Sequence, residues 1–193
     1  LLFAAHWTEG YADMIQKGIG GKVVRFHVLA NSDSEADQAL KLAVRDRVLQ
    51  EYGDLLEACT SKEETLAALK NAQQEISETA EAEVLAQGYT YPVRVSLVRE
   101  EFPFKKYGDL IFPAGVYDAL RIEIGEAKGK NWWCVLYPQM CYVDAAWGYS
   151  TEESHVRLQN TLTKEEFLVV SAMEQKKVTP KIKCRLVELW SER

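Results

Sequence analysis

Cys134 and Cys141 are the residues whose type and spacing most directly suggest covalent chemistry. They flank the segment VLYPQM, and a tight reversal at Tyr137-Pro138 would set them opposite each other on two antiparallel strands. Directly opposed residues at non-hydrogen-bonded positions have Cα atoms about 4.5 Å apart, close to the separation that a disulfide accepts. We therefore predict a Cys134–Cys141 disulfide, and the pairing of Cys59 and Cys184 stays open.

The same cysteine offers an alternative reading as a nucleophile. An extracytoplasmic cysteine hydrolase would use Cys134 with His27 or His155 as the base and Asp33 to orient that base. Cys134 lies in an apolar run, where a thiol tends to stay protonated and unreactive. His27 lies between Phe26 and Val28, where a histidine is more often a packed side chain with one hydrogen-bond partner. We predict no catalytic residue and keep the hydrolase as the alternative.

Several other classes of function lack the residue patterns that they need. The cysteines and histidines are not arranged as the close ligand pairs typical of structural zinc, so no metal site is expected. Gly18, Gly20 and Gly21 have neither the spacing nor the lysine of a phosphate-binding loop, and no cofactor is expected. The 193 residues carry a formal net charge of -6 without a basic stretch, which argues against a nucleic-acid partner.

A polar segment and a tryptophan pair are the candidates for binding a partner. The polar segment directly follows the predicted strand at residues 22–30 and consists of Asn31-Ser32-Asp33-Ser34-Glu35. We call it the strand-helix loop. Loops of this kind often present binding groups, although small polar side chains also cap helices without any ligand. Trp132 and Trp133 alternate across a strand, so one should enter the core and the other can serve as an interface anchor. The predicted partner-binding residues are Asn31, Ser32, Asp33, Asp37, Trp132 and Trp133.

The first half of the chain must position these residues on a strand and two helices. Residues 6–21 are read as a short helical or irregular lead-in that stops at the glycines, and residues 22–30 as a buried strand. The next helix should begin with a capping box, either Ser32 with Glu35 or Ser34 with Asp37. Its predicted apolar stripe consists of Ala36, Leu40, Val44, Val48 and Leu55. The predicted solvated side carries Asp37, Lys41, Arg45 and Asp46. Asp37 and Lys41 are also predicted to form an i,i+4 ion pair. A second helix should run from Thr60 or Ser61 toward Gly88.

The second half of the chain shows the alternating pattern of strands. Alternating runs at 93–97 and 120–124 and an apolar run at 132–137 predict strands, with hairpin and loop at 102–116. Residues 144–161 are read as a loop, Thr163 with Glu166 as the cap of a short helix, and Ile182, Cys184 and Leu186 as a last strand. This order predicts an α+β fold, a mostly antiparallel sheet with two longer helices packed on one face and a short C-terminal helix.

The beginning of the chain suggests export or tethering. Leu1 to Ala5 (LLFAA) is apolar but far shorter than the roughly 20 residues of a spanning helix. We expect residues 1–21 to be a lead-in after a removed or truncated membrane or signal segment, and residues 22–193 to be a single globular domain.

Three segments together resemble the stage II sporulation protein R family. They are RFHVLANSDSEADQALKLAVRD at residues 25–46, PAGVY at residues 113–117, and GKNWWCVLYPQMC at residues 129–141. The resemblance covers about residues 22–142. No family motif is matched beyond that point, so two alternatives stay open for the remaining residues: a different role, or a lineage-specific addition.

The resemblance implies a signalling protein made in the forespore and exported into the space between forespore and mother cell, where it can remain membrane-associated. Its implied partner is a membrane-embedded aspartic protease, the sporulation sigma-E factor-processing peptidase, which it activates so that pro-sigma-E is processed in the mother cell. An exported location would also allow the Cys134–Cys141 disulfide to form. On this reading, substituting Asp33 or Trp132 weakens signalling without unfolding the domain.

Overall fold

The computed structural model describes residues 2–141 and 152–172. Its sheet has the strand order β2-β5-β1-β6. The strands are β1 (Val24–Leu29), β2 (Val93–Phe102), β5 (Gly115–Ile124) and β6 (Asn131–Tyr137). β1 runs parallel to β5 and antiparallel to β6, and β2 and β5 pair antiparallel. The predicted α+β class with a mostly antiparallel sheet is confirmed.

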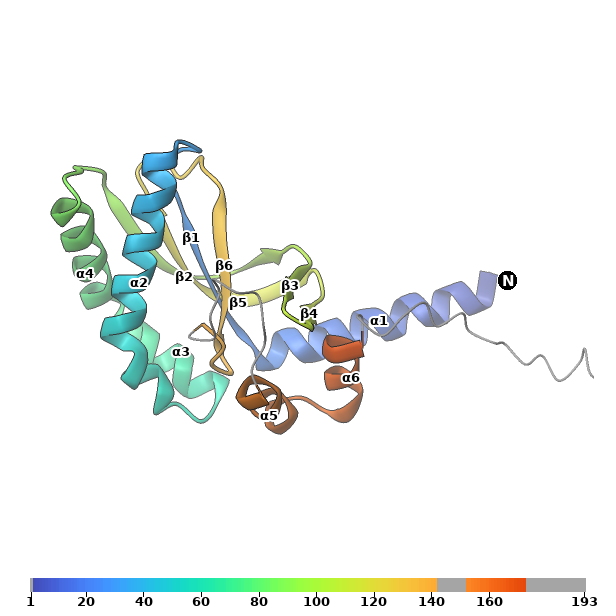
Figure 1. Cartoon of the computed structure of the whole chain (residues 1–193). Helices are drawn as coiled ribbons and strands as arrows, with labels where there is room; N and C mark the ends of the chain where they lie inside the picture. The colour runs from blue at the N-terminus through green and yellow to red at the C-terminus, as the bar shows by residue number, and fades with distance from the viewer. Residues whose placement is uncertain (1, 142–151, 173–193) are drawn as a thin grey trace, which may run out of the picture.

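Helices α2 (Glu35–Glu57), α3 (Lys62–Asn71) and α4 (Gln73–Ala86) cover one face of this sheet. In Figure 1, α2 and α4 lie side by side as the two longer helices of that face, and α3 joins them below. Their apolar residues meet the strand residues that alternate toward them, among them Phe26, Ile122 and Leu136. This main core follows directly from the predicted periodicities.

The N-cap of α2 was predicted correctly, but the environment of several of its residues was not. Ser34 is the N-cap and accepts a hydrogen bond from the backbone N–H of Asp37, which is one half of the second predicted capping box. The other half is not formed, because Ser34 N donates to Ser32 Oγ and the Asp37 carboxylate binds Asn31 and Ser32. Asp37 and Lys41, however, are buried rather than solvated, and Ala36 and Leu55 are exposed rather than part of the apolar stripe. The Lys41 ammonium donates to Gln38 Oε1 at 2.6 Å and to the Lys130 carbonyl at 3.0 Å instead of pairing with Asp37. Both side chains are buried because the first turns of α2 lie against the segment before β6. The helical pattern of the sequence does not predict this long-range contact.

The predicted second helix is split at Ala72 into α3 and α4. Its start is confirmed, because the Ser61 side chain caps α3 by accepting from the backbone N–H of Glu64. The break contains neither glycine nor proline. It follows from packing: α3 contacts β1, whereas α4 runs along α2 and β2, and Gln73 at the bend donates to the Val95 carbonyl at 3.0 Å.

The other face of the sheet is covered over part of its length by a second core. Helix α1 (Leu2–Lys22), the hairpin β3 (Lys105–Tyr107) and β4 (Leu110–Phe112), and the helices α5 (Glu152–Thr161) and α6 (Lys164–Ala172) supply it. Residues 102–116 thus form the predicted hairpin and loop. Residues 152–161 form a helix rather than the predicted loop. The predicted strand at residues 182–186 and Cys184 lie outside the described residues.

Thr163 and Glu166 form the predicted capping box of α6. Thr163 N donates to Glu166 Oε2 at 2.7 Å, and Glu166 N donates to Thr163 Oγ1 at 3.2 Å. The same carboxylate accepts from Lys22 Nζ at 2.6 Å, so the cap also fixes the end of α1.

Helix α1 continues through the glycines at which it was predicted to stop. A Cβ at Gly18 would lie 2.2 Å from Glu166 Oε1, and a Cβ at Gly20 would lie 2.6 Å from the Val116 carbonyl oxygen. The glycines therefore permit close packing of α1 on α6 and β5 rather than ending the helix.

Gly20→Ala is expected to destabilise the protein by about 1–3 kcal/mol, because the methyl group would collide with backbone that cannot rotate away. Gly21→Ala is the matched control: a Cβ there meets nothing within 4 Å, so helix propensity predicts no loss of stability. Urea unfolding of both variants makes the measurement. Equal stability of the two alanine variants would contradict the close packing of α1 on β5.

Candidate interaction surface

Four side chains form a row across the whole sheet, on the face opposite α2 and α4. The strand register pairs Ser96 of β2 with Arg121 of β5, Arg121 with His27 of β1, and His27 with Trp133 of β6. Since side chains alternate along strands, residues in register point to the same face. We call Ser96, Arg121, His27 and Trp133 the cross-sheet row.

A glutamate from β2 bridges the middle of the cross-sheet row. Glu100 Oε1 lies 2.7 Å from His27 Nε2, and Glu100 Oε2 lies 3.0 Å from Arg121 Nη1. Glu123 approaches from the neighbouring row, with its Oε2 3.5 Å from Arg121 Nη2 and 3.2 Å from Arg94 Nη1. The row is therefore held within a network of alternating charges.

His27 is neutral at ordinary pH despite its carboxylate neighbour. Its side chain is only 3% exposed, and burial, followed by the positive charge of Arg121, lowers its pKa from 6.5 to about 4. The Glu100 carboxylate lies close to the ring, and a hydrogen bond with the Asn131 side chain opposes this lowering of the pKa.

Trp133 closes the cross-sheet row at the edge strand. Its ring stacks on the His27 imidazole, with centroids 5.0 Å apart and an interplanar angle of 12°. Phe102 meets Trp133 edge-on at 4.9 Å, and the Lys105 ammonium lies 5.2 Å from the Trp133 ring centroid. Trp133 is half-buried, so part of its surface remains available to a partner.

The strand-helix loop follows the end of β1 and is tied by hydrogen bonds to the segment that precedes β6. Asn31 Oδ1 accepts from Glu126 N at 2.9 Å, and Asp33 Oδ1 accepts from Lys130 N at 2.7 Å. Gly125 approaches Asn31 so closely that a Cβ there would collide with its side chain. The polar residues of the loop thus stabilise the neighbouring turn, and Asp33 remains exposed.

Asp37 anchors this arrangement from the first turn of α2. Its buried carboxylate accepts from Asn31 Nδ2 at 2.9 Å and from Ser32 Oγ at 2.5 Å. These hydrogen bonds, that of Ser32 first, lower the pKa of Asp37 because they favour the charged form. Asp37 therefore belongs to the framework of the loop.

The lowered pKa of Asp37 predicts a contribution to acid stability. The carboxylate stabilises the fold above its unfolded pKa of about 3.8, and this contribution is lost as the pH falls through the lower native pKa. Thermal unfolding between pH 2 and 7 should show a stability loss at the acid end that is smaller in Asp37→Asn. An identical pH profile in the two proteins would argue against the effect.

Trp132 points to the opposite face from Trp133, as the alternation predicts. It packs edge-on against Phe26, with ring centroids 5.7 Å apart, and the Arg45 guanidinium of α2 lies 4.8 Å from its ring centroid. Trp132 thus covers the edge of the main core, and the two tryptophans do not form one patch.

A disulfide joins Cys134 and Cys141, with Cα atoms 5.6 Å apart. Cys141 lies in a turn after β6 rather than on a second strand, so the predicted antiparallel pair of strands is wrong. Both cysteines are buried, and the bond ties the turn after Pro138 back to the middle of β6. Cys59 is a free, partly buried thiol.

The structure does not bring together the residues of the hydrolase alternative. Cys134 is in register with Phe26, so it faces the main core, whereas His27 faces the other way. His155 of α5 lies 3.0 Å from Asp109 Oδ2, and the Asp33 carboxylate binds the Lys130 backbone. With its sulfur in the disulfide, Cys134 is also not a free thiol.

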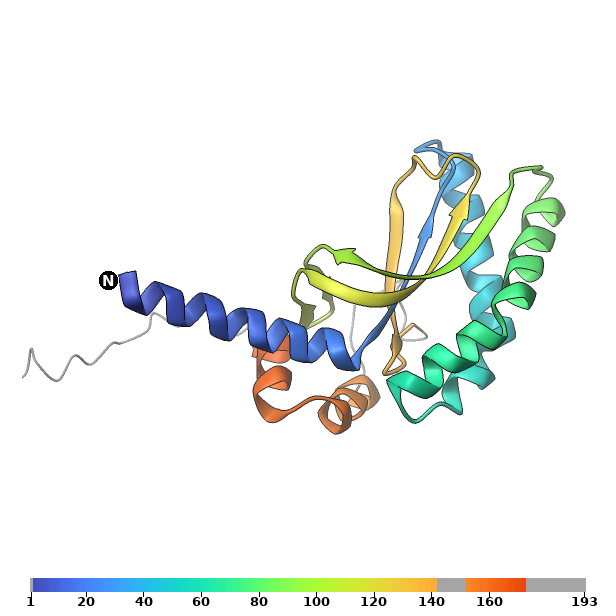
Figure 2. The same ribbon diagram turned by 180° about the vertical axis from the view of Figure 1, so that it is seen from behind.

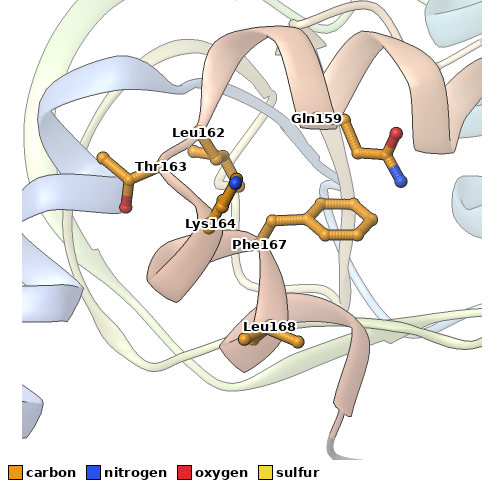
Figure 3. Close-up of a pocket in the computed structure, with 6 residues that line it drawn as sticks. All are labelled: Gln159, Leu162, Thr163, Lys164, Phe167 and Leu168. Atoms are coloured by element: carbon orange, nitrogen blue, oxygen red, sulfur yellow. The ribbon is translucent and has the colours of Figure 1, made fainter.

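A pocket of about 370 Å³ lies between α5 and α6, away from the cross-sheet row (Figure 3). It is lined by Gln159, Leu162, Thr163, Lys164, Phe167 and Leu168. The Phe167 ring and the leucines make it mainly apolar, so it suits an apolar side chain rather than a charged group.

Neither a metal-binding cluster nor a helix fit to cross a membrane occurs among the described residues. Residues 2–141 and 152–172 contain no group of three or more histidine, cysteine or acidic side chains placed to hold a metal ion. No helix within these ranges is both long and apolar enough to cross a membrane.

Reasoning from the sequence missed Ser96, Glu100 and Arg121, which join His27 in the cross-sheet network. Ser96 and Arg121 fall in the alternating runs at 93–97 and 120–124, and Glu100 lies just beyond the first run, all at polar positions that are ordinarily solvated. The available signal was the excess of charged residues on that face of β2 and β5. Only the register, set by the parallel pairing of β1 with β5, brings them to His27.

Comparisons with known proteins agree with the family resemblance of the segments at residues 25–46, 113–117 and 129–141. The family model of stage II sporulation protein R matches residues 20–147. The stage II sporulation protein R of Bacillus subtilis (strain 168) is 32% identical over 184 residues, which cover 90% of this chain and 82% of that protein. The coverage shows that the likeness extends beyond residue 142. No solved structure matches. The chain belongs to the stage II sporulation protein R family, and its role lies in sporulation.

Proposed function

We propose that this chain is an exported signal made in the forespore, which activates a membrane-embedded aspartic protease and so causes pro-sigma-E to be processed in the mother cell. Membership of the stage II sporulation protein R family is the observation that carries this proposal. The Cys134–Cys141 disulfide is consistent with an extracytoplasmic location, because disulfides persist mainly in oxidising compartments.

The proposed mechanism is association rather than catalysis. A ligand can shift a protease toward its active conformation only by binding that conformation more tightly than the inactive one. The contribution of this chain is then a shaped surface, and no bond in a substrate is broken by its own side chains.

We propose that the contact surface includes the exposed Asp33 of the strand-helix loop and the half-buried Trp133. Asn31, Ser32 and Asp37 support this surface through the hydrogen bonds that hold the loop against Glu126 and Lys130. Trp132 contributes from the other side of β6, beside α2.

Complementation tests the function. A Bacillus subtilis strain that lacks its stage II sporulation protein R is given this chain with an export signal, and pro-sigma-E processing is followed by immunoblot. Processing should return, and the same chain without the signal is the control that should fail. An exported, folded chain that neither restores processing nor binds the detergent-solubilised protease would refute the proposal.

A further inference from the structure

The pocket between α5 and α6 leaves apolar surface open to solvent. Leu168 of α6, which lines the pocket, is 60% exposed, more than any other large apolar side chain of the described residues except Leu85. In Figure 3, the Phe167 ring points toward Gln159 of α5, so an aromatic face also forms part of the wall between the two helices. Exposed apolar surface that is gathered at one place marks a contact site.

The chain itself continues from this pocket. Helix α6 ends at Ala172, about one helical turn after Leu168, and residues 173–193 follow directly. Ten residues of chain can span about 30 Å, so a segment that starts near residue 182 can reach back to the pocket. A short covalent connection also gives an effective concentration on the order of millimolar, so modest apolar contact suffices for docking.

Residues 182–190 have the composition to fill this pocket. The stretch is IKCRLVELW, with apolar side chains at Ile182, Leu186, Val187, Leu189 and Trp190. Removal of aliphatic and aromatic side chains from water is the main favourable term when two apolar surfaces meet. The pocket is lined by the same classes of side chain, so the two surfaces match in kind.

Charge favours the same contact. Residues 173–193 carry six of the 23 basic and three of the 29 acidic residues, a net charge of +3, which leaves -9 on residues 1–172. Glu152 and Glu153 at the start of α5 and Glu165 on α6 are exposed. The basic residues within and beside the apolar stretch therefore meet an acidic surface.

We propose that residues 182–190 dock into the pocket between α5 and α6 of the same molecule, with Trp190 and its aliphatic neighbours against Phe167 and Leu168. The docked segment covers the apolar surface of α6 and holds this helix in the second core. The inference concerns contacts within this chain and does not rest on the proposed function, so each can fail without the other.

Disulfide cross-linking in the full chain tests the contact. Since Cys134 and Cys141 are paired, Cys59→Ser leaves Cys184 without another free thiol, and Leu168→Cys then adds one at the pocket. Glu165→Cys is the matched control, because it is exposed on the same helix but does not line the pocket. Under copper-phenanthroline oxidation, Cys184 should link to position 168 at least fivefold faster than to position 165, as read by peptide mapping.

Hydrogen exchange gives a second readout that involves no cysteine. Trp190→Ala should speed exchange of the amides at residues 164–172 by at least tenfold, because α6 loses its covering contact, and should leave those of β1 unchanged. Ser191→Ala is the matched control at a neighbouring polar residue and should exchange like the unmodified protein.

Two kinds of result would overturn the docking. One is equal cross-linking at positions 165 and 168, or exchange of α6 in Trp190→Ala within twofold of the unmodified protein. The other is a link at position 168 that joins two molecules, seen as a dimer on a non-reducing gel, which would assign the pocket to a second copy of the chain. Neither result bears on activation of the protease, which complementation tests separately.

Discussion

Replacing Arg25 with alanine is expected to lower the free energy of unfolding by about 3–5 kcal/mol, the range found when a large buried side chain is truncated. Arg25 is 0% exposed and lies on β1 among the rings of Phe102, Tyr107, Phe112 and Tyr117, at 4.9 to 5.6 Å from their centroids. The hairpin β3–β4 supplies two of these rings, so the guanidinium holds that hairpin against the sheet.

The loss has two physical components. Alanine leaves a cavity between the rings, and it removes the hydrogen bonds from Arg25 Nε to the Cys134 carbonyl at 3.1 Å and from Arg25 Nη2 to Tyr107 Oη at 2.8 Å. Burial also lowers the pKa of Arg25, which shows that the site penalises the charge itself. Aromatic faces offset part of that penalty.

Arg25→Met separates volume from charge. Methionine fills most of the space without the desolvation penalty, so it should lose less than half as much stability as alanine in urea unfolding. Hydrogen exchange should show that the amides of residues 105–112 lose protection in Arg25→Ala. A stability loss below about 1 kcal/mol for the alanine variant would mean that Arg25 does not hold the hairpin.

Removing the disulfide is expected to cost about 2–3 kcal/mol, the chain-entropy value for a closed loop of this length. Cys134→Ser and Cys141→Ser should be equally destabilised, and the double variant should match either one, because each change breaks the same bond. Denaturant unfolding with and without a reductant makes the measurement. The reductant should lower the stability of the unmodified protein to that of the variants and leave the variants unchanged.

The same pair of variants separates the disulfide from the hydrolase alternative. A nucleophile at Cys134 would make the two serine variants unequal in activity, whereas a disulfide makes them alike. Full pro-sigma-E processing with Cys141→Ser but none with Cys134→Ser, both at equal stability, would contradict the structural role that we assign to the bond.

Patterns that depend on nearest neighbours were read correctly from the sequence. The N-caps at Ser34 and Ser61 and the capping box of Thr163 with Glu166 are local hydrogen bonds, and the sequence specifies both partners. The alternation of Val95, Leu120 and Ile122 shows which strand faces are buried, so the α+β class followed. The opposite orientations of Trp132 and Trp133 followed from the same period of two.

Predictions failed where a residue distant in the sequence decides the environment. Gly18 and Gly20 read as helix breakers, yet α1 needs their missing side chains to approach Glu166 and Val116. Asp37 and Lys41 read as a solvated pair, yet the segments at 31–33 and 125–130 bury both.

The sequence alone determined the class of fold, the family and the cysteines that pair, because these depend on local periodicity, local capping and recognisable segments. Only the tertiary structure decided which charges surround His27. Glu100 and Arg121 reach it through the register of strands that lie far from β1 in the sequence, and register is set by the packing of the whole sheet rather than by any neighbouring residue.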